Sequence, residues 1–131
     1  MNSLGFRHIA LNVLDPARTA EFYVRVLRMT VEWQPDADNY YLTAGGLDNL
    51  AIHRTLEAPT GAQRLDHIGI AVPAADDVDA WHAHLLEQTV EIVAPPRTHR
   101  DGARSLYFRD PDGLVVQIIH HLPIAVRAQQ A

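Results

Sequence analysis

The chain of 131 residues contains no cysteine, no long apolar run and no excess of positive charge. The lack of cysteine excludes disulfides, thiolate chemistry and cysteine-ligated zinc, so any metal must be bound through nitrogen or oxygen. Charged residues interrupt each apolar stretch before it reaches the ~20 residues of a membrane-spanning helix, and the start MNSLGFRH has no apolar signal-peptide core. We therefore expect one soluble, cytoplasmic domain that does not bind a membrane.

Charge and histidine content narrow the function classes further. The formal net charge is −5, from 11 Lys and Arg against 16 Asp and Glu, and the basic residues are scattered singly except between Arg97 and Arg109. Such a chain is not expected to bind nucleic acid. The eight histidines are about twice what average usage predicts for this length, which indicates metal or acid–base chemistry.

The sequence repeats itself. A shift of 59 positions lays Phe6–Val13 on Leu65–Val72 without a gap and places His8 on His67, since 67 − 8 = 59. The tails of the two halves match at a longer shift, 117 − 51 = 66, which lays Ala51 on Gln117. The extra residues of the second half fall near Pro95–Gly102, where we expect a mobile loop.

Each half is typical of a strand, a helix and three further strands. Polar and apolar residues alternate over Phe6–Val13, and Asp15 and Pro16 then begin a helix with an apolar stripe. Three short β-prone runs follow, with a turn at Pro35–Asp36 between the first two: Thr30–Trp33, Tyr40–Thr43 and Leu50–Arg54. The sequence predicts an α+β fold of two tandem βαβββ modules, about residues 4–58 and 65–121, with a loosely ordered tail at 122–131.

The two βαβββ halves, a histidine in the first strand of each, and the segment Ser105–Gly113 before the last strand resemble the vicinal oxygen chelate superfamily. This group includes glyoxalases, extradiol dioxygenases, fosfomycin-inactivating thiol transferases and bleomycin-binding resistance proteins. The likeness covers residues 4 to about 121. It implies curled mixed sheets that form a cup around one divalent metal ion, and a homodimer that can exchange halves.

The resemblance also implies which residues hold the metal, because the ligands of the family come from the first and last strands of each half. The corresponding positions are His8, Ala51, His67 and Gln117. Ala51 supplies no ligand, as in the dioxygenases, and Gln117 stands where those enzymes have glutamate. Two imidazoles and one further ligand leave three octahedral positions open, which favours Fe²⁺ over Mn²⁺, Zn²⁺, Ni²⁺ or Co²⁺. An amide in place of a carboxylate removes one negative charge, so we expect an anionic, chelating substrate.

Strand alternation and the repeat add candidate pocket residues. Asn49 and His53 lie two positions either side of Ala51 and should share its face of the sheet. This makes His53 a candidate acid–base group or replacement ligand, and Asn49 a candidate substrate contact. Tyr41 falls opposite Tyr107 in the repeat, so both hydroxyls are candidates to orient a ligand, and Tyr107 is a second candidate to move a proton.

Two more residues are candidate substrate contacts. By the resemblance, Ser105 occupies a position, like Tyr107, at which fosfomycin transferases contact their substrate. Arg104 lies next to the inserted loop and can pair with an anion.

Two functions remain open at this point. The first is a metal-dependent enzyme acting on a small molecule, by oxygenase-like chemistry or as a lyase or isomerase such as a glyoxalase. The second is a metal-free module that binds a drug or metabolite. Retention of both histidines favours the first, and Gln117 favours the second.

Overall fold

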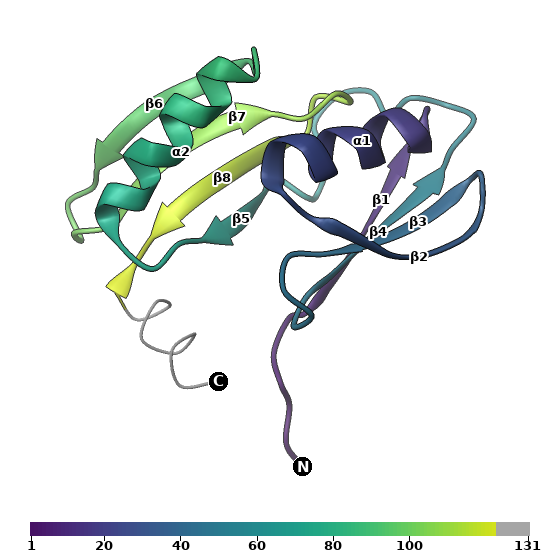
Figure 1. The fold of residues 1–131 in the computed structure, drawn as a ribbon, viewed down its shortest axis with the longest axis horizontal. Helices are drawn as coiled ribbons and strands as arrows, with labels where there is room; N and C mark the ends of the chain where they lie inside the picture. The colour runs from purple at the N-terminus through teal and green to yellow at the C-terminus, as the bar shows by residue number, and fades with distance from the viewer. Residues whose placement is uncertain (123–131) are drawn as a thin grey trace. The chain divides into compact units, whose positions relative to one another are not determined.

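The computed structural model describes residues 1–122, so the tail expected from residue 122 lies, from residue 123 on, outside the described residues. The chain divides into two compact units, the first spanning Met1–Gly61 and the second beginning at Ala62. We call them module 1 and module 2 and describe each by itself. The strand–helix–three-strand order predicted for each half is confirmed (Figure 1).

Module 1 is a mixed four-stranded sheet with one helix. Its elements are β1 (His8–Val13), α1 (Pro16–Leu27), β2 (Thr30–Asp36), β3 (Asn39–Thr43) and β4 (Asn49–Arg54). The strand order is β1-β4-β3-β2, in which β1 and β4 are parallel and the other pairs are antiparallel. The first and last strands of the module are therefore neighbours, and His8 lies directly beside Asn49.

Module 2 repeats this topology. Its elements are β5 (His67–Ala71), α2 (Ala75–Glu87), β6 (Ile92–Thr98), β7 (Arg104–Arg109) and β8 (Val115–His120). The strand order is β5-β8-β7-β6, again with the first and last strands parallel. Gly69 on β5 pairs with Gln117 on β8, which in turn pairs with Tyr107 on β7.

The start of α1 follows the sequence signals. The Asp15 carboxylate accepts a hydrogen bond from the Arg18 backbone N–H at 3.1 Å, and Pro16 takes the first helical position, where no N–H is needed. The helix ends at Arg28 in a left-handed conformation. Its apolar stripe, which includes the fully buried Tyr23 and Val26, packs on β3 and β4.

Each helix leaves one face of its sheet uncovered by that helix. In β3 and β4 the buried residues Leu42, Leu50 and Ile52 alternate with Tyr41, Ala51 and His53, so the second set lies on the face away from α1. In module 2, α2 packs on β6, β7 and β8, as Figure 1 shows. We call the sheet surface away from the helix the distal face of each module.

In module 2 the same alternation places Leu106, Phe108 and Ile118, all fully buried, on the helix side. Tyr107 and Gln117 alternate with them and therefore lie on the distal face, as their register pairing requires. Strand alternation predicts that the candidate residues of a module share one face of its sheet. Tyr107 and Gln117 do share one, the distal face of module 2.

One predicted turn and part of one predicted loop are strand in the structure, and prolines explain both. Pro35–Asp36 was expected to be a turn, but β2 continues to Asp36 and the chain reverses over the next two residues. The loop expected at Pro95–Gly102 is strand as far as Thr98, followed by a short turn. Both prolines lie where the ladder register shifts, in β2 and β6, which are the edge strands of their sheets. Edge strands tolerate proline because one side of the strand needs no N–H donor.

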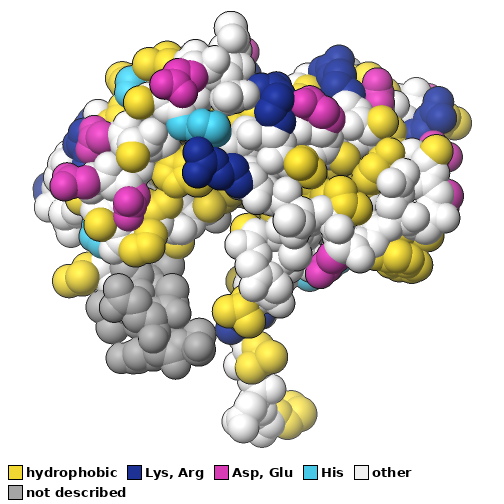
Figure 2. All heavy atoms as spheres, viewed as in Figure 1, with side chains coloured by type: hydrophobic (Ala, Val, Ile, Leu, Met, Phe, Trp, Pro, Cys, Tyr) yellow, Lys and Arg dark blue, Asp and Glu magenta, His cyan; other side chains and the backbone are white. Residues whose placement is uncertain are grey.

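Within residues 1–122 no helix has the length and apolar character needed to cross a membrane. Figure 2 shows basic and acidic side chains interspersed on the face that it draws.

Candidate functional site

His8 on β1 is held by a chain of hydrogen bonds within module 1. Its Nδ1 lies 2.7 Å from the Asn49 amide oxygen, and the Asn49 amide nitrogen donates to the Glu32 carboxylate. Because a carboxylate only accepts, the Asn49 amide must direct its nitrogen to Glu32 and its oxygen to His8. Nδ1 of His8 then carries the proton, and its Nε2 keeps a lone pair.

A second series of hydrogen bonds, again from a carboxylate through an asparagine, holds His53 on β4. Its Nδ1 lies 2.6 Å from the Asn39 amide oxygen, and the Asn39 amide nitrogen donates to both Asp36 carboxylate oxygens at 2.8 and 3.1 Å. The same reasoning fixes the amide and leaves the lone pair of His53 on Nε2. Sequence reasoning selected His53 but missed Asp36 and Asn39, because only the strand register reveals that Asn39 lies opposite His53.

Aromatic rings lie beside His53 on the distal face of module 1. Trp33 stacks on Tyr41 with ring centroids 4.9 Å apart, and Tyr41 meets the His53 ring edge-on at 5.8 Å. Trp33 is 59% exposed, although a side chain of this size is usually buried. Tyr41, a predicted substrate contact, is thus brought next to His53, a predicted acid–base group.

In module 2, His67 on β5 is also held through Nδ1. The Asp66 carboxylate accepts from it at 2.6 Å, so in the neutral ring the lone pair again resides on Nε2. The ring meets that of Tyr107 edge-on at a centroid distance of 5.5 Å. The His67 side chain is 35% exposed and therefore stays accessible to a ligand. Asp66 directly precedes His67 in the sequence, so adjacency alone could have indicated this partner.

Gln117 and Tyr107 form the second pair of module 2. The Gln117 amide nitrogen donates to the Tyr107 hydroxyl oxygen at 2.8 Å, so the tyrosine proton is left for another acceptor. The Gln117 oxygen faces β5, where a Cβ added to Gly69 would lie 3.3 Å from it. Gly69 therefore makes room for this oxygen, and Tyr107 holds the amide in the orientation that presents it.

Ser105 lies on the same face of β7 as Tyr107 but is almost fully buried. Its hydroxyl lies 2.8 Å from Nε2 of His99, a residue to which the sequence assigned no role. The structure thus gives Ser105 a partner in the turn after β6.

Arg104 is directed elsewhere. Its guanidinium makes a two-pronged pair with the Asp79 carboxylate on α2, at 2.9 and 2.6 Å, and also donates to Thr98. This hydrogen bond and the positive charge hold the pKa of Asp79 below its usual value and raise that of Arg104. The structure therefore does not bring Arg104 to Tyr107, because alternation along β7 places it on the side that α2 covers.

Within each module the structure brings together part of the candidate set. Module 1 joins His8 to Asn49, and His53 to Tyr41; module 2 joins His67, Tyr107 and Gln117. Over residues 1–122, no three His, Asp or Glu side chains gather in a way that could hold a metal ion.

Comparison with known proteins gives a consistent match. The model of the Glyoxalase/Bleomycin resistance protein/Dioxygenase superfamily matches residues 5–118. A metallothiol transferase FosB from Staphylococcus saprophyticus is 25% identical over 110 residues, which cover 83% of this chain and 72% of the relative.

Two solved structures share the fold. The fosfomycin resistance protein FosX from Listeria monocytogenes has a TM-score of 0.75 at 23% identity and covers 95% of this chain and 99% of its own. A lactoylglutathione lyase from Agrobacterium tumefaciens has a TM-score of 0.76 at 15% identity and covers 92% of this chain and 96% of its own.

Proposed function

The chain belongs to the Glyoxalase/Bleomycin resistance protein/Dioxygenase superfamily, and from this premise we propose that it is a divalent-metal-dependent enzyme whose substrate is a small anion that chelates through neighbouring oxygens. We propose His8, His67 and Gln117 as the metal ligands. The observation that carries the proposal is that Nδ1 of each histidine faces an oxygen that accepts its hydrogen bond, which leaves Nε2 as the nitrogen available to a ligand.

The chemistry of these donors fits a divalent ion. Metal-binding histidines almost always donate their other ring N–H to a carboxylate, carbonyl or water, which orients the ring and increases its basicity. Asn49 and Asp66 serve this purpose, and Glu32 stands behind Asn49. Two imidazole nitrogens and one amide oxygen suit Fe²⁺, Mn²⁺, Zn²⁺, Ni²⁺ or Co²⁺, and the three positions left open favour Fe²⁺.

A bound ion would supply Lewis-acid stabilisation of the negative charge on a substrate oxygen. Because His8, His67 and Gln117 are all neutral ligands, they leave the charge of the ion uncompensated. An anionic substrate restores neutrality, so a carboxylate, enolate, phenolate or phosphonate should bind better than a neutral analogue. Fosfomycin, which FosX confers resistance to, is a first anion to test.

Residues on the two distal faces would handle protons and orient the substrate. The Tyr107 hydroxyl accepts from Gln117 and therefore has its own proton to donate to a substrate oxygen. His53 donates from Nδ1 to Asn39, so Nε2 of its neutral ring can accept a proton, and Tyr41 lies beside it. The reaction class we favour is oxygenase-like, since Ala51 supplies no fourth ligand, with lyase or isomerase chemistry as the next candidate.

Metal analysis with three variants tests this proposal. Protein purified without chelators should retain about one divalent ion per chain, and His67→Ala should lose it. Gln117→Glu should bind the ion more tightly by a factor of at least ~10, because it restores a charged ligand. His82→Ala, a substitution on α2, is the matched control and should leave the metal content unchanged. Tighter binding of neutral than of anionic analogues to the metal-loaded protein would contradict the expected substrate class.

A metal-free binding protein is the second candidate, and the neutral amide at position 117 favours it. Without a carboxylate at this position the three proposed ligands are all neutral, which weakens the attraction for a cation. If neither the natural protein nor Gln117→Glu retains Fe, Mn, Zn, Ni or Co, and a small molecule still binds, the enzyme proposal is refuted and this one replaces it.

A further inference from the structure

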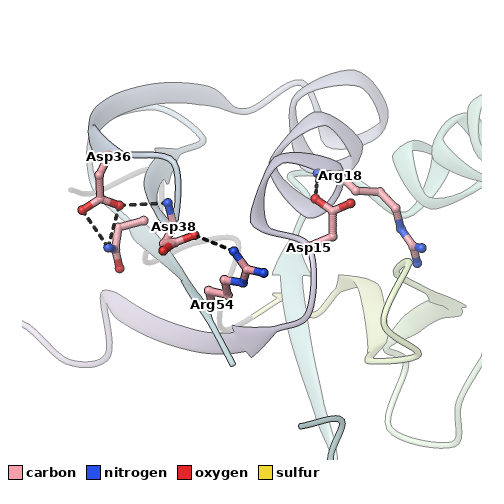
Figure 3. Close-up of polar contacts among 6 residues, drawn as sticks. Asp15, Arg18, Asp36, Asp38 and Arg54 are labelled. Atoms are coloured by element: carbon pink, nitrogen blue, oxygen red, sulfur yellow. Dashed lines mark hydrogen bonds and ion pairs between the residues drawn. The ribbon is translucent and has the colours of Figure 1, made fainter. Parts of the chain in front are cut away.

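The hairpin between β2 and β3 places a carboxylate, an amide and an imidazole in series. Asp36 ends β2, Asn39 begins β3 opposite it, and His53 lies opposite Asn39 on β4. Figure 3 shows the Asp36 carboxylate in several contacts at the hairpin, one of which comes from the Asp38 backbone N–H at 2.8 Å. We call Asp36, Asn39 and His53 the hairpin relay.

The hairpin relay fixes one tautomer of His53 by a sequence of forced choices. Asp36 can only accept, so Asn39 must direct its amide nitrogen there, and it does so to both carboxylate oxygens. The Asn39 oxygen is then the group that faces His53, and it can accept only from a protonated Nδ1. Free neutral imidazole exchanges between both tautomers, whereas the neutral ring of His53 is restricted to the one with its proton on Nδ1.

The role that we infer for Nε2 of His53 differs from that of Nε2 in His8. The same arrangement of carboxylate, asparagine and histidine holds His8, for which we propose a metal. His53 occupies no ligand position of the repeat and is half-buried beside an aromatic ring. An oriented lone pair that is not used for a metal is suited to accept a proton.

The neighbouring strands and the hairpin supply the polar groups around His53. On β3 the neighbouring titratable group is Tyr41, on β2 it is Asp36, and β1 presents the neutral Asn12 opposite His53. The nearby charges of Asp38 and Arg54 are engaged with each other at 3.3 Å, as Figure 3 shows.

We propose that His53 is the proton acceptor of module 1 and that Asp36 and Asn39 are positioning residues that hold its neutral ring in the tautomer with the lone pair on Nε2. A substrate O–H or C–H bond breaks, the proton forms an N–H bond at Nε2, and the bonding electron pair stays on the substrate. His53 becomes an imidazolium while Nδ1 continues to donate to Asn39. This inference rests on the proposed function in that an anionic intermediate needs such an acceptor.

Nuclear magnetic resonance of the metal-free protein with ¹⁵N-labelled histidine tests the hairpin relay without any substrate. The His53 signals should be those of the Nδ1–H tautomer near neutral pH. Asn39→Ala should shift them toward a mixture of both tautomers, and Asp36→Asn should do so partly, because Asn39 could then rotate. Asp38→Asn is the matched control: it lies in the same hairpin and removes the pair with Arg54, but leaves the tautomer unchanged.

A second measurement asks whether Nε2 can be reached. Diethyl pyrocarbonate modifies unprotonated imidazole nitrogens, and peptide mapping would give the rate at each histidine, with His82 and His84 on α2 as internal references. His53 should be modified at Nε2. A His53 that is unreactive while the references react, or that shows the Nε2–H tautomer, overturns the inference. Neither measurement depends on metal retention, so failure of the proposed metal site would be seen separately.

Discussion

Replacing Gly69 by alanine should separate the function of Gln117 from the stability of module 2. Gly69 lies in β5 directly beside Gln117, and its backbone is outside the left-handed region, so alanine fits the conformation. The new Cβ would lie 3.3 Å from the Gln117 amide oxygen and 3.8 Å from the Ile119 side chain. The first contact is tight and requires the amide oxygen to move by a few tenths of an ångström.

The substitution changes the free energy of unfolding through two terms of opposite sign. Glycine within a strand costs about 0.5–1 kcal/mol relative to alanine, so the backbone term stabilises the variant. The crowded amide offsets part of this gain, and we expect the melting temperature to change by less than about 5 °C. The metal ligand would be displaced and partly screened, which we expect to weaken binding by ~10–100-fold, the usual range for disturbed ligand surroundings.

A double-mutant cycle makes the test specific. Metal affinity is measured by calorimetric titration for the natural protein, Gly69→Ala, Gln117→Ala and the combination, with thermal unfolding of each as the control for folding. If Gly69→Ala acts through Gln117, its effect on affinity should vanish in the Gln117→Ala background. An unchanged metal affinity in Gly69→Ala with the fold intact would refute the assignment of Gln117 as a ligand.

Three further predictions concern stability and assembly. Asp15→Ala removes the acceptor that caps α1 and should lower the free energy of unfolding by about 1 kcal/mol, measured by urea denaturation. Asp79→Asn should lower the melting temperature slightly at neutral pH. The pair with Arg104 depresses the pKa of Asp79, so its contribution is present above the ordinary carboxyl pKa and is lost as the pH falls below that value, where the melting temperatures of the two proteins should converge. Light scattering should give twice the chain mass of 14.6 kDa, and a monomer at micromolar concentration would contradict the expected homodimer.

The fold was predictable because the same pattern of strands and helix occurs in both halves of the sequence. The histidine strand, the proline-capped helix and the three short strands recur at nearly constant spacing, and both copies form the same βαβββ topology. The errors came from reading proline as a turn signal at Pro35 and in the Pro95–Gly102 segment. Proline is compatible with an edge strand, but only the strand order, which depends on pairing between distant segments, shows which strands are edges.

The candidate site was predictable only in part, for a related physical reason. Alternation along a strand places Tyr41, His53, Tyr107 and Gln117 on the distal faces without knowledge of any contact. The partners that determine their chemistry come from neighbouring strands, and a register shift of one residue would exchange them. Asn39 meets His53 for this reason.

The hydrogen-bond partners of His8 and His67 affect the charge balance of the proposed metal site, in which Gln117 is a neutral ligand. Glu32 and Asp66 are carboxylates that reach His8 and His67 through hydrogen bonds, one of them by way of Asn49. In the metal site that we propose, they would orient the imidazoles without occupying a coordination position, so the charge of the ion would stay directed at the substrate. A glutamate at position 117 would reverse this balance, because it strengthens metal binding and weakens the attraction for an anion. The Gln117→Glu variant should therefore hold metal better and bind anionic ligands worse, and a variant that gained both would show that the amide does not govern substrate charge.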